Sequence, residues 1–184
     1  MPIPLGILAQ FRQAAAGDFV LLEQQVLGST TASVTFSNLA TYASTYKHLQ
    51  IRLVARDNGG LGFSSIGFRF NNDSSSIYAR HSLSGNGSSV SSSAASSETQ
   101  GFLGGITHAG STANSFAPMV IDLVDAYASK NKTVRVLGGQ TQDSVYLISS
   151  LWASTAQINS MNIYSRIGAD FVTGSRFSLY GVKG

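Results

Sequence analysis

Short segments in which apolar and polar residues alternate dominate the chain from residue 19 onward. Leu49 and Ile51 are followed by the polar residues Gln50 and Arg52, and the alternation continues less cleanly at Leu53 and Val54. This period of two is typical of a strand with one buried face. The same reasoning predicts strands at residues 19–27, 33–36, 49–55, 66–70, 116–123, 133–136, 145–152, 158–164 and 176–182. Only residues 124–129 indicate a helical turn.

Turn-forming residues separate these segments, at positions 57–60, 71–73, 85–87 and 138–139. Glycine, asparagine and aspartate favour the backbone conformations of tight turns. Pro118 lies inside an apolar run, so we expect a sheet edge or a bulge there, because proline has no N–H for a ladder. Many short strands joined by such turns predict an all-β domain, a jelly-roll-like antiparallel β-sandwich over residues 19–184.

Residues 1–18 differ from the rest and predict an extended N-terminal arm, because Pro2 and Pro4 favour extended backbone. The apolar side chains of this arm are those of Ile3, Leu5, Ile7, Leu8 and Phe11. A segment so short cannot bury its own apolar side chains. We therefore expect these five residues to contact a partner chain, or the arm to pack as a strand on its own sheet, and the sequence leaves both open.

Residues 82–97 are rich in serine, glycine and alanine and contain no charged residue. Such low complexity predicts a solvated loop. Because loops often carry function, a long loop of this kind could also contact a partner.

The composition excludes several classes of protein. Charged residues make up 11% of the chain and hydrophobic residues 43%, whereas soluble domains contain about 25% charged residues. Helical bundles and charge-rich disordered chains are therefore excluded. The net charge is +3, and the densest basic stretch (Lys130, Lys132 and Arg135) follows Asp122 and Asp125. We interpret these as isolated solubilising charges rather than a nucleic-acid groove, which needs many phosphate contacts in one patch.

The chain contains no cysteine, which excludes disulfides and thiolate chemistry. No stretch approaches the roughly 20 apolar residues of a membrane span. The first residues lack a basic segment and match a secretory signal poorly. We therefore expect neither membrane nor nucleic acid as a partner.

Candidate catalytic and metal-binding residues are few. His48, His81 and His108 lie far apart in the sequence, without metal-ligand spacing, and we interpret them as scattered surface residues. Asp122 and Asp125 form the one close acidic pair. With Lys130 and Lys132 nearby, capping or salt-bridge roles fit this pair better than glycoside hydrolysis or calcium binding.

The aromatic residues fall at strand spacing and predict core packing rather than a sugar-binding platform. They are Phe63, Phe68, Phe70, Trp152 and Tyr180. With so few acids, bases and nucleophiles, the sequence predicts a protein that is not an enzyme and needs no cofactor.

Several stretches read together resemble a known family. They include Tyr46-Lys47-His48-Leu49-Gln50 and Ser175-Arg176-Phe177-Ser178-Leu179-Tyr180-Gly181, with Arg69-Phe70-Asn71-Asn72-Asp73 between them. In these stretches the chain resembles small virion structural proteins of tailed bacteriophages. It departs from the family at Asp125-Ala126-Tyr127, where tyrosine would directly follow aspartate.

The resemblance implies a jelly-roll-like sandwich that assembles on a virus particle in the host bacterial cytoplasm. It implies either a capsid cement or decoration protein, or a tail-fibre, tailspike or baseplate component that attaches to a host-surface receptor. The apolar arm beside a jelly-roll pattern favours the first, and we expect a homotrimer that contacts the major capsid protein through residues 1–12. The family supplies no catalytic residues.

Overall fold

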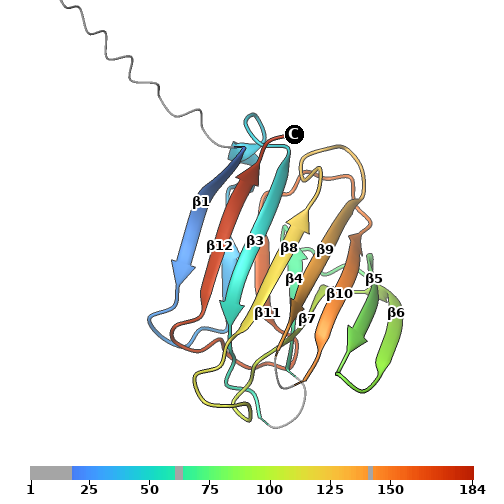
Figure 1. The fold of residues 1–184 in the computed structure, drawn as a ribbon. Helices are drawn as coiled ribbons and strands as arrows, with labels where there is room; N and C mark the ends of the chain where they lie inside the picture. The colour runs from blue at the N-terminus through green and yellow to red at the C-terminus, as the bar shows by residue number, and fades with distance from the viewer. Residues whose placement is uncertain (1–17, 61–63, 141–142) are drawn as a thin grey trace, which may run out of the picture.

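The protein is an all-β sandwich of two antiparallel sheets, which confirms the predicted fold class (Figure 1). The structure, a computed structural model, describes residues 18–60, 64–140 and 143–184. Its strands are β1 (Phe19–Val26), β2 (Ser33–Phe36), β3 (His48–Ala55), β4 (Ser64–Phe70), β5 (Tyr78–Gly85), β6 (Val90–Glu98), β7 (Gly101–Ile106), β8 (Ala117–Leu123), β9 (Lys132–Gly139), β10 (Val145–Trp152), β11 (Met161–Ser165) and β12 (Arg176–Val182).

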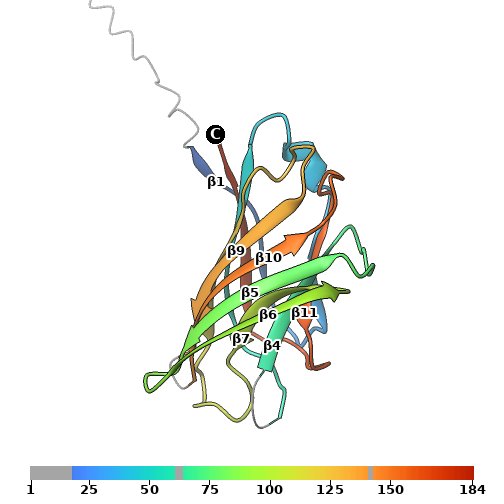
Figure 2. The ribbon, with the colours of Figure 1, turned by 90° about the vertical axis from the view of Figure 1, so that its right-hand side faces the viewer.

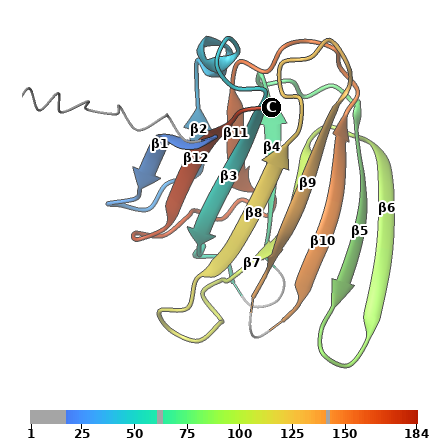
Figure 3. The ribbon, with the colours of Figure 1, turned by 45° about the horizontal axis from the view of Figure 1, so that its top comes forward.

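Eight strands form one sheet in the order β1-β12-β3-β8-β9-β10-β5-β6, and four form the other in the order β2-β11-β4-β7. The larger sheet covers the smaller one, and its outer face is turned toward the viewer in Figure 1. Figure 3 shows the two layers from above, with β4 and β11 behind the larger sheet. All pairings between these strands are antiparallel.

The core lies between the sheets and is built from alternate residues of each strand. Leu49, Ile51 and Leu53 of β3 are buried and face the smaller sheet, as their spacing predicts. Phe68 and Phe70 of β4 are fully buried from the other side. Burial of such side chains stabilises a fold by roughly 1.5–3 kcal/mol each, so this layer is the main source of stability.

Strand β7 is buried along its whole length and contains three glycines. Gly101 shows why one of them is required. A Cβ atom at this position would lie 2.0 Å from Cε1 of Phe68. The phenyl ring therefore occupies the space that any other side chain would need. This strand was missed in the sequence because Gly101–Ile106 shows no alternation of apolar and polar residues.

The serine-rich residues 82–97 form no loop, so this prediction is wrong. They belong to a hairpin of β5 and β6 that closes at residues 86–89 (Figure 2). The side-chain oxygen of Asn86 accepts hydrogen bonds from the N–H groups of Ser88 and Ser89, and Gly87 has a φ of 86°. The turn predicted at residues 85–87 is thus confirmed. It joins two serine-rich strands that the sequence did not predict.

The position of Pro118 and the short helical segments differ from the expectations. Pro118 lies in β8, which is an interior strand between β3 and β9 and not an edge. The proline is tolerated because the ladder with β9 begins one residue later, at Met119. A 3-10 helix at Leu39–Tyr42 was not predicted. The predicted helical turn after residue 123 is a hydrogen-bonded turn.

Candidate functional site

Exposed apolar side chains gather on the outer face of the larger sheet. Leu147 of β10 lies opposite Leu137 of β9 on one side and opposite Leu83 of β5 on the other. Val145 and Val90 lie two residues along, toward the ends of their strands. We call these five residues the apolar patch, and they are between 47% and 75% exposed. Contiguous apolar surface of this kind marks interaction sites in soluble proteins.

The patch continues into a hollow of about 470 Å³ toward β8, where Pro118, Val120 and Gly138 line the surface. The next row along the strands is polar and contains Arg135 and His81. The patch therefore has a polar border at one end, which resembles the apolar centre and polar rim of protein–protein interfaces.

Sequence reasoning missed the patch, although a signal was present. The stretch from Val145 to Ile148 is apolar at every position, and two of its side chains point inward while two point outward. Continuous apolar runs are typical of strands that are covered on both faces. In the described residues nothing covers the outer face of this strand.

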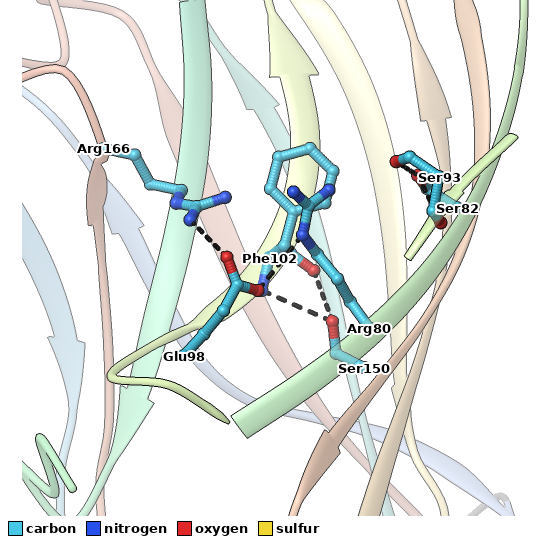
Figure 4. Close-up of polar contacts among 7 residues, drawn as sticks. All are labelled: Arg80, Ser82, Ser93, Glu98, Phe102, Ser150 and Arg166. Carbon is cyan, nitrogen blue, oxygen red and sulfur yellow. Dashed lines mark hydrogen bonds and ion pairs between the residues drawn. The ribbon is translucent and has the colours of Figure 1, made fainter. Parts of the chain in front are cut away.

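A polar cleft of about 400 Å³ lies on the inner side of the β5–β6 hairpin. Figure 4 shows its ionic centre. The Glu98 carboxylate accepts hydrogen bonds from Nε of Arg80 at 3.1 Å and from a terminal nitrogen of Arg166 at 2.9 Å. Both guanidinium groups lie over the ring of Phe102, at 4.3 and 5.1 Å from its centroid. Two cations share one carboxylate, so this end of the cleft carries a net positive charge.

Hydroxyl groups line the rest of the cleft. The Oγ atoms of Ser82 and Ser93 lie 2.7 Å apart across the hairpin, as Figure 4 shows. Toward the mouth, the Tyr146 hydroxyl donates to the Asp143 carboxylate at 2.9 Å. Burial and this carboxylate raise the pKa of Tyr146, so the phenol keeps its proton at neutral pH. Hydroxyls, guanidinium groups and a carboxylate together offer both donors and acceptors.

Asp122 and Asp125 have separate hydrogen-bond and ion-pair partners. Asp122 lies on β8 and accepts a hydrogen bond from Gln50 at 2.7 Å, whereas Asp125 lies in the following turn with a φ of 51°. Asp125 forms an ion pair with Lys130, which confirms a salt-bridge role for this residue. The Lys130 ammonium group lowers the pKa of Asp125.

Lys132 is not an isolated solubilising charge, so this interpretation is wrong for one residue. Its side chain is buried, and its ammonium group donates to the backbone oxygens of Ala128 and Lys130 at 2.8 and 2.7 Å. Burial lowers the pKa of Lys132. The Lys132 side chain therefore holds the backbone of the loop before β9 in place and does not face solvent.

The structure keeps the three histidines apart. The Nδ1 atom of His48 accepts the N–H of Asp125 at 2.8 Å. His81 lies within β5, while His108 lies in a loop. Among the residues that the structure describes, no three His, Cys, Asp or Glu side chains gather as metal ligands. In the same part of the chain, no helix has the length and apolar character needed to cross a membrane.

The aromatic residues divide between the core and the surface. Phe68, Phe70 and Trp152 are buried, which confirms core packing. Tyr180 is half-buried, stacks on Phe19 at 4.7 Å on the outer face and therefore is not a core residue. Phe63 lies outside the described residues, as do the predicted arm contacts Ile3, Leu5, Ile7, Leu8 and Phe11.

Comparisons of this chain with family models, with curated proteins and with solved structures found no match.

Proposed function

We propose that this chain is a bacteriophage virion structural protein that binds the shell of the major capsid protein as a cement or decoration protein. The observation that carries the proposal is the apolar patch, which lies on regular strands of a rigid sheet. A protein that stabilises a shell needs binding surface rather than reactive groups. The resemblance of the sequence to small phage virion proteins supports the same role.

The patch is suited to a permanent contact. Leu137, Leu147 and Leu83 lie side by side on three neighbouring strands, so their positions are fixed by backbone hydrogen bonds before any partner arrives. A preformed surface loses little conformational entropy on binding. The patch contains no charged residue, so its burial requires no desolvation of ions. The N-terminal segment of residues 1–12 stays a second predicted contact with the shell.

The first prediction concerns binding to the shell. Replacing Leu137 and Leu147 together by serine is expected to weaken binding to purified capsid shells by about tenfold or more, because apolar area would no longer be buried on binding. Binding is measured by cosedimentation of the purified chain with shells. Both side chains are at least half exposed, so the variant should unfold at the same temperature as the natural chain.

A matched control is Val124→Ser, which removes a valine that is 55% exposed in the turn after β8. This variant should bind shells like the natural chain. Quantification of the chain in purified particles tests the proposal directly, since a cement protein is present in a copy number comparable to that of the shell subunits. The proposal would be contradicted if the chain were absent from virions, or if the variant with both leucines replaced bound shells as tightly as the natural chain.

A second candidate function is host attachment as a tail-fibre, tailspike or baseplate component. The observation that favours it is the cleft beneath the β5–β6 hairpin, whose lining alternates hydroxyl, guanidinium and carboxylate groups. A polyhydroxylated ligand such as a cell-surface polysaccharide needs donors and acceptors in close alternation, which this lining provides.

The second prediction separates the two functions. Ser82→Trp is expected to fill the cleft and to abolish binding of labelled chain to the surface polysaccharide of susceptible cells, because Ser82 faces the cleft interior. Thr133→Trp, on the outer face of β9, is the control and should leave this binding unchanged. Flow cytometry gives the bound fraction. If the natural chain binds no susceptible host, the attachment function is wrong.

A further inference from the structure

The free edges of the two sheets differ in how they are protected against pairing with another chain. An edge strand exposes unpaired N–H and C=O groups, and natural proteins block it with charges, prolines, bulges or short length, or cover it with other parts of the chain. Among the described residues the edge strands are β1, β6, β2 and β7. Three of these four carry such protection.

Each protected edge has a visible device. Strand β1 contains Glu23 and an irregular register between Leu21 and Glu23. Strand β2 has four residues, and β7 is buried along its whole length. The remaining edge, β6, runs over nine residues from Val90 to Glu98, and it is the edge turned toward the viewer in Figure 2.

Strand β6 lacks every one of these devices over most of its length. Residues 90–97 contain neither a charged residue nor a proline, and the register with β5 is regular from Val90 to Ala95. Irregularity begins only near Ser97, whose φ is 56°. Six consecutive residues are therefore extended, exposed at all but one position and free of repelling charge.

The side chains of this stretch do not block the backbone N–H and C=O groups along the free edge of β6. The hydroxyls of Ser91 and Ser93 are bonded to serines of β5 on the inner face. On the outer face, Val90 belongs to the apolar patch and lies opposite Gly85 of β5. The patch therefore reaches the unprotected edge itself.

We infer that β6 pairs antiparallel with β6 of a second copy of this chain. A two-fold axis perpendicular to the sheet places the two β6 strands side by side and antiparallel. Each strand then offers its unpaired N–H and C=O groups to the same groups of the other copy. This symmetry keeps the two outer faces on the same side. The apolar patches of the two copies then join across the new edge into one continuous surface, which adds apolar contact to the backbone hydrogen bonds.

The pairing requires that no like charges meet across the axis. Like charges directly opposite each other destabilise an antiparallel pair, and the stretch from Val90 to Ala95 has none. The smallest oligomer produced by this contact is a dimer, whereas the sequence-based expectation was a trimer. The inference concerns the contact between copies and holds whether the chain serves a capsid or a tail.

A single-cysteine scan tests the contact, because the natural chain contains no cysteine. Ser91, Ser92, Ser93 and Ala94 are replaced by cysteine one at a time in the full chain. Antiparallel two-fold pairing places only one residue directly opposite its own copy, at a Cα distance of about 4.5–5.5 Å that suits a disulfide. Oxidation should therefore link dimers at one position far more completely than at its neighbours. Thr133→Cys on β9 is the control and should stay monomeric on denaturing gels.

The mass in solution provides a second readout. The natural chain should have twice the mass of a 19.3 kDa monomer by light scattering. Adding charge with Ser92→Lys and Ala94→Lys should reduce this to the monomer mass, while Asn131→Lys with Thr133→Lys, which adds the same charge away from the edge, should leave the dimer intact. A monomeric natural chain, a trimer, or equal crosslinking at all four positions would overturn the inference.

Discussion

Replacing Phe68 by alanine is expected to lower the free energy of unfolding by about 3–5 kcal/mol. The ring is fully buried and packs edge-on against Phe70 and Tyr78, with centroid distances of 4.8 and 5.9 Å. It also fills the space beside Gly101. Removing the ring leaves a cavity between the sheets that rigid strands cannot close. Urea unfolding followed by the fluorescence of Trp152, the one tryptophan, measures the change.

The control for this prediction is Leu147→Ala, which shortens a side chain that is half exposed in the apolar patch. It should change stability by well under half as much, since most of the lost contact is with water. A pair of variants refines the test, because Gly101→Ala adds a methyl group where Phe68→Ala removes a ring. The double variant should be more stable than the sum of the two single losses implies. Strict additivity would show that the two residues do not share this space.

Replacing Asp57 by alanine is expected to lower the free energy of unfolding by about 3 kcal/mol, because the variant leaves several buried donors without an acceptor. The carboxylate is fully buried and accepts the N–H of Gly59 at 3.1 Å and the hydroxyl of Ser64. Its backbone also pairs with Phe171 and Thr107. One residue thus ties the end of β3 to the segments beside β7 and β12. Thermal and urea unfolding give the loss.

Two variants accompany Asp57→Ala. Asp57→Asn keeps the shape and one carbonyl oxygen, so it should cost about half as much. Asp122→Ala removes a half-buried carboxylate that accepts one hydrogen bond from Gln50, and it should cost about 1 kcal/mol or less. If Asp57→Ala proves no more harmful than Asp122→Ala, the buried carboxylate does not organise this end of the sandwich.

The sequence predicts strands well where their two faces differ in polarity. Strands β3 and β12 have the predicted positions because one set of alternate residues enters a common core, whereas β10 was found from its run of apolar residues. The hairpin of β5 and β6 was missed because serine occupies both faces, as at Ser91 and Ser92. There the strands are held by backbone hydrogen bonds and by serine pairs across the hairpin, and neither leaves a periodic pattern.

The two candidate surfaces could not be located from the sequence for a different reason. Arg80, Glu98, Phe102 and Arg166 come from four separate segments, and only the pairing of β5 with β6 and the packing of β7 bring them together. The apolar patch was hidden because a leucine looks the same whether it faces the core or solvent. Strand register decides which side Leu147 takes, and register is a property of the whole sheet.

The position of β12 affects how the chain reaches its native state. This last strand lies between β1 and β3 and pairs with both, so the first strand has no neighbour in its sheet until residues 176–182 have been synthesised. During translation, β1 must wait with its inner edge unpaired while some 150 later residues emerge from the ribosome, and long waits of this kind slow folding. The larger sheet is therefore completed only after residues 176–182 have left the ribosome, and until then β1 has no partner strand within its sheet.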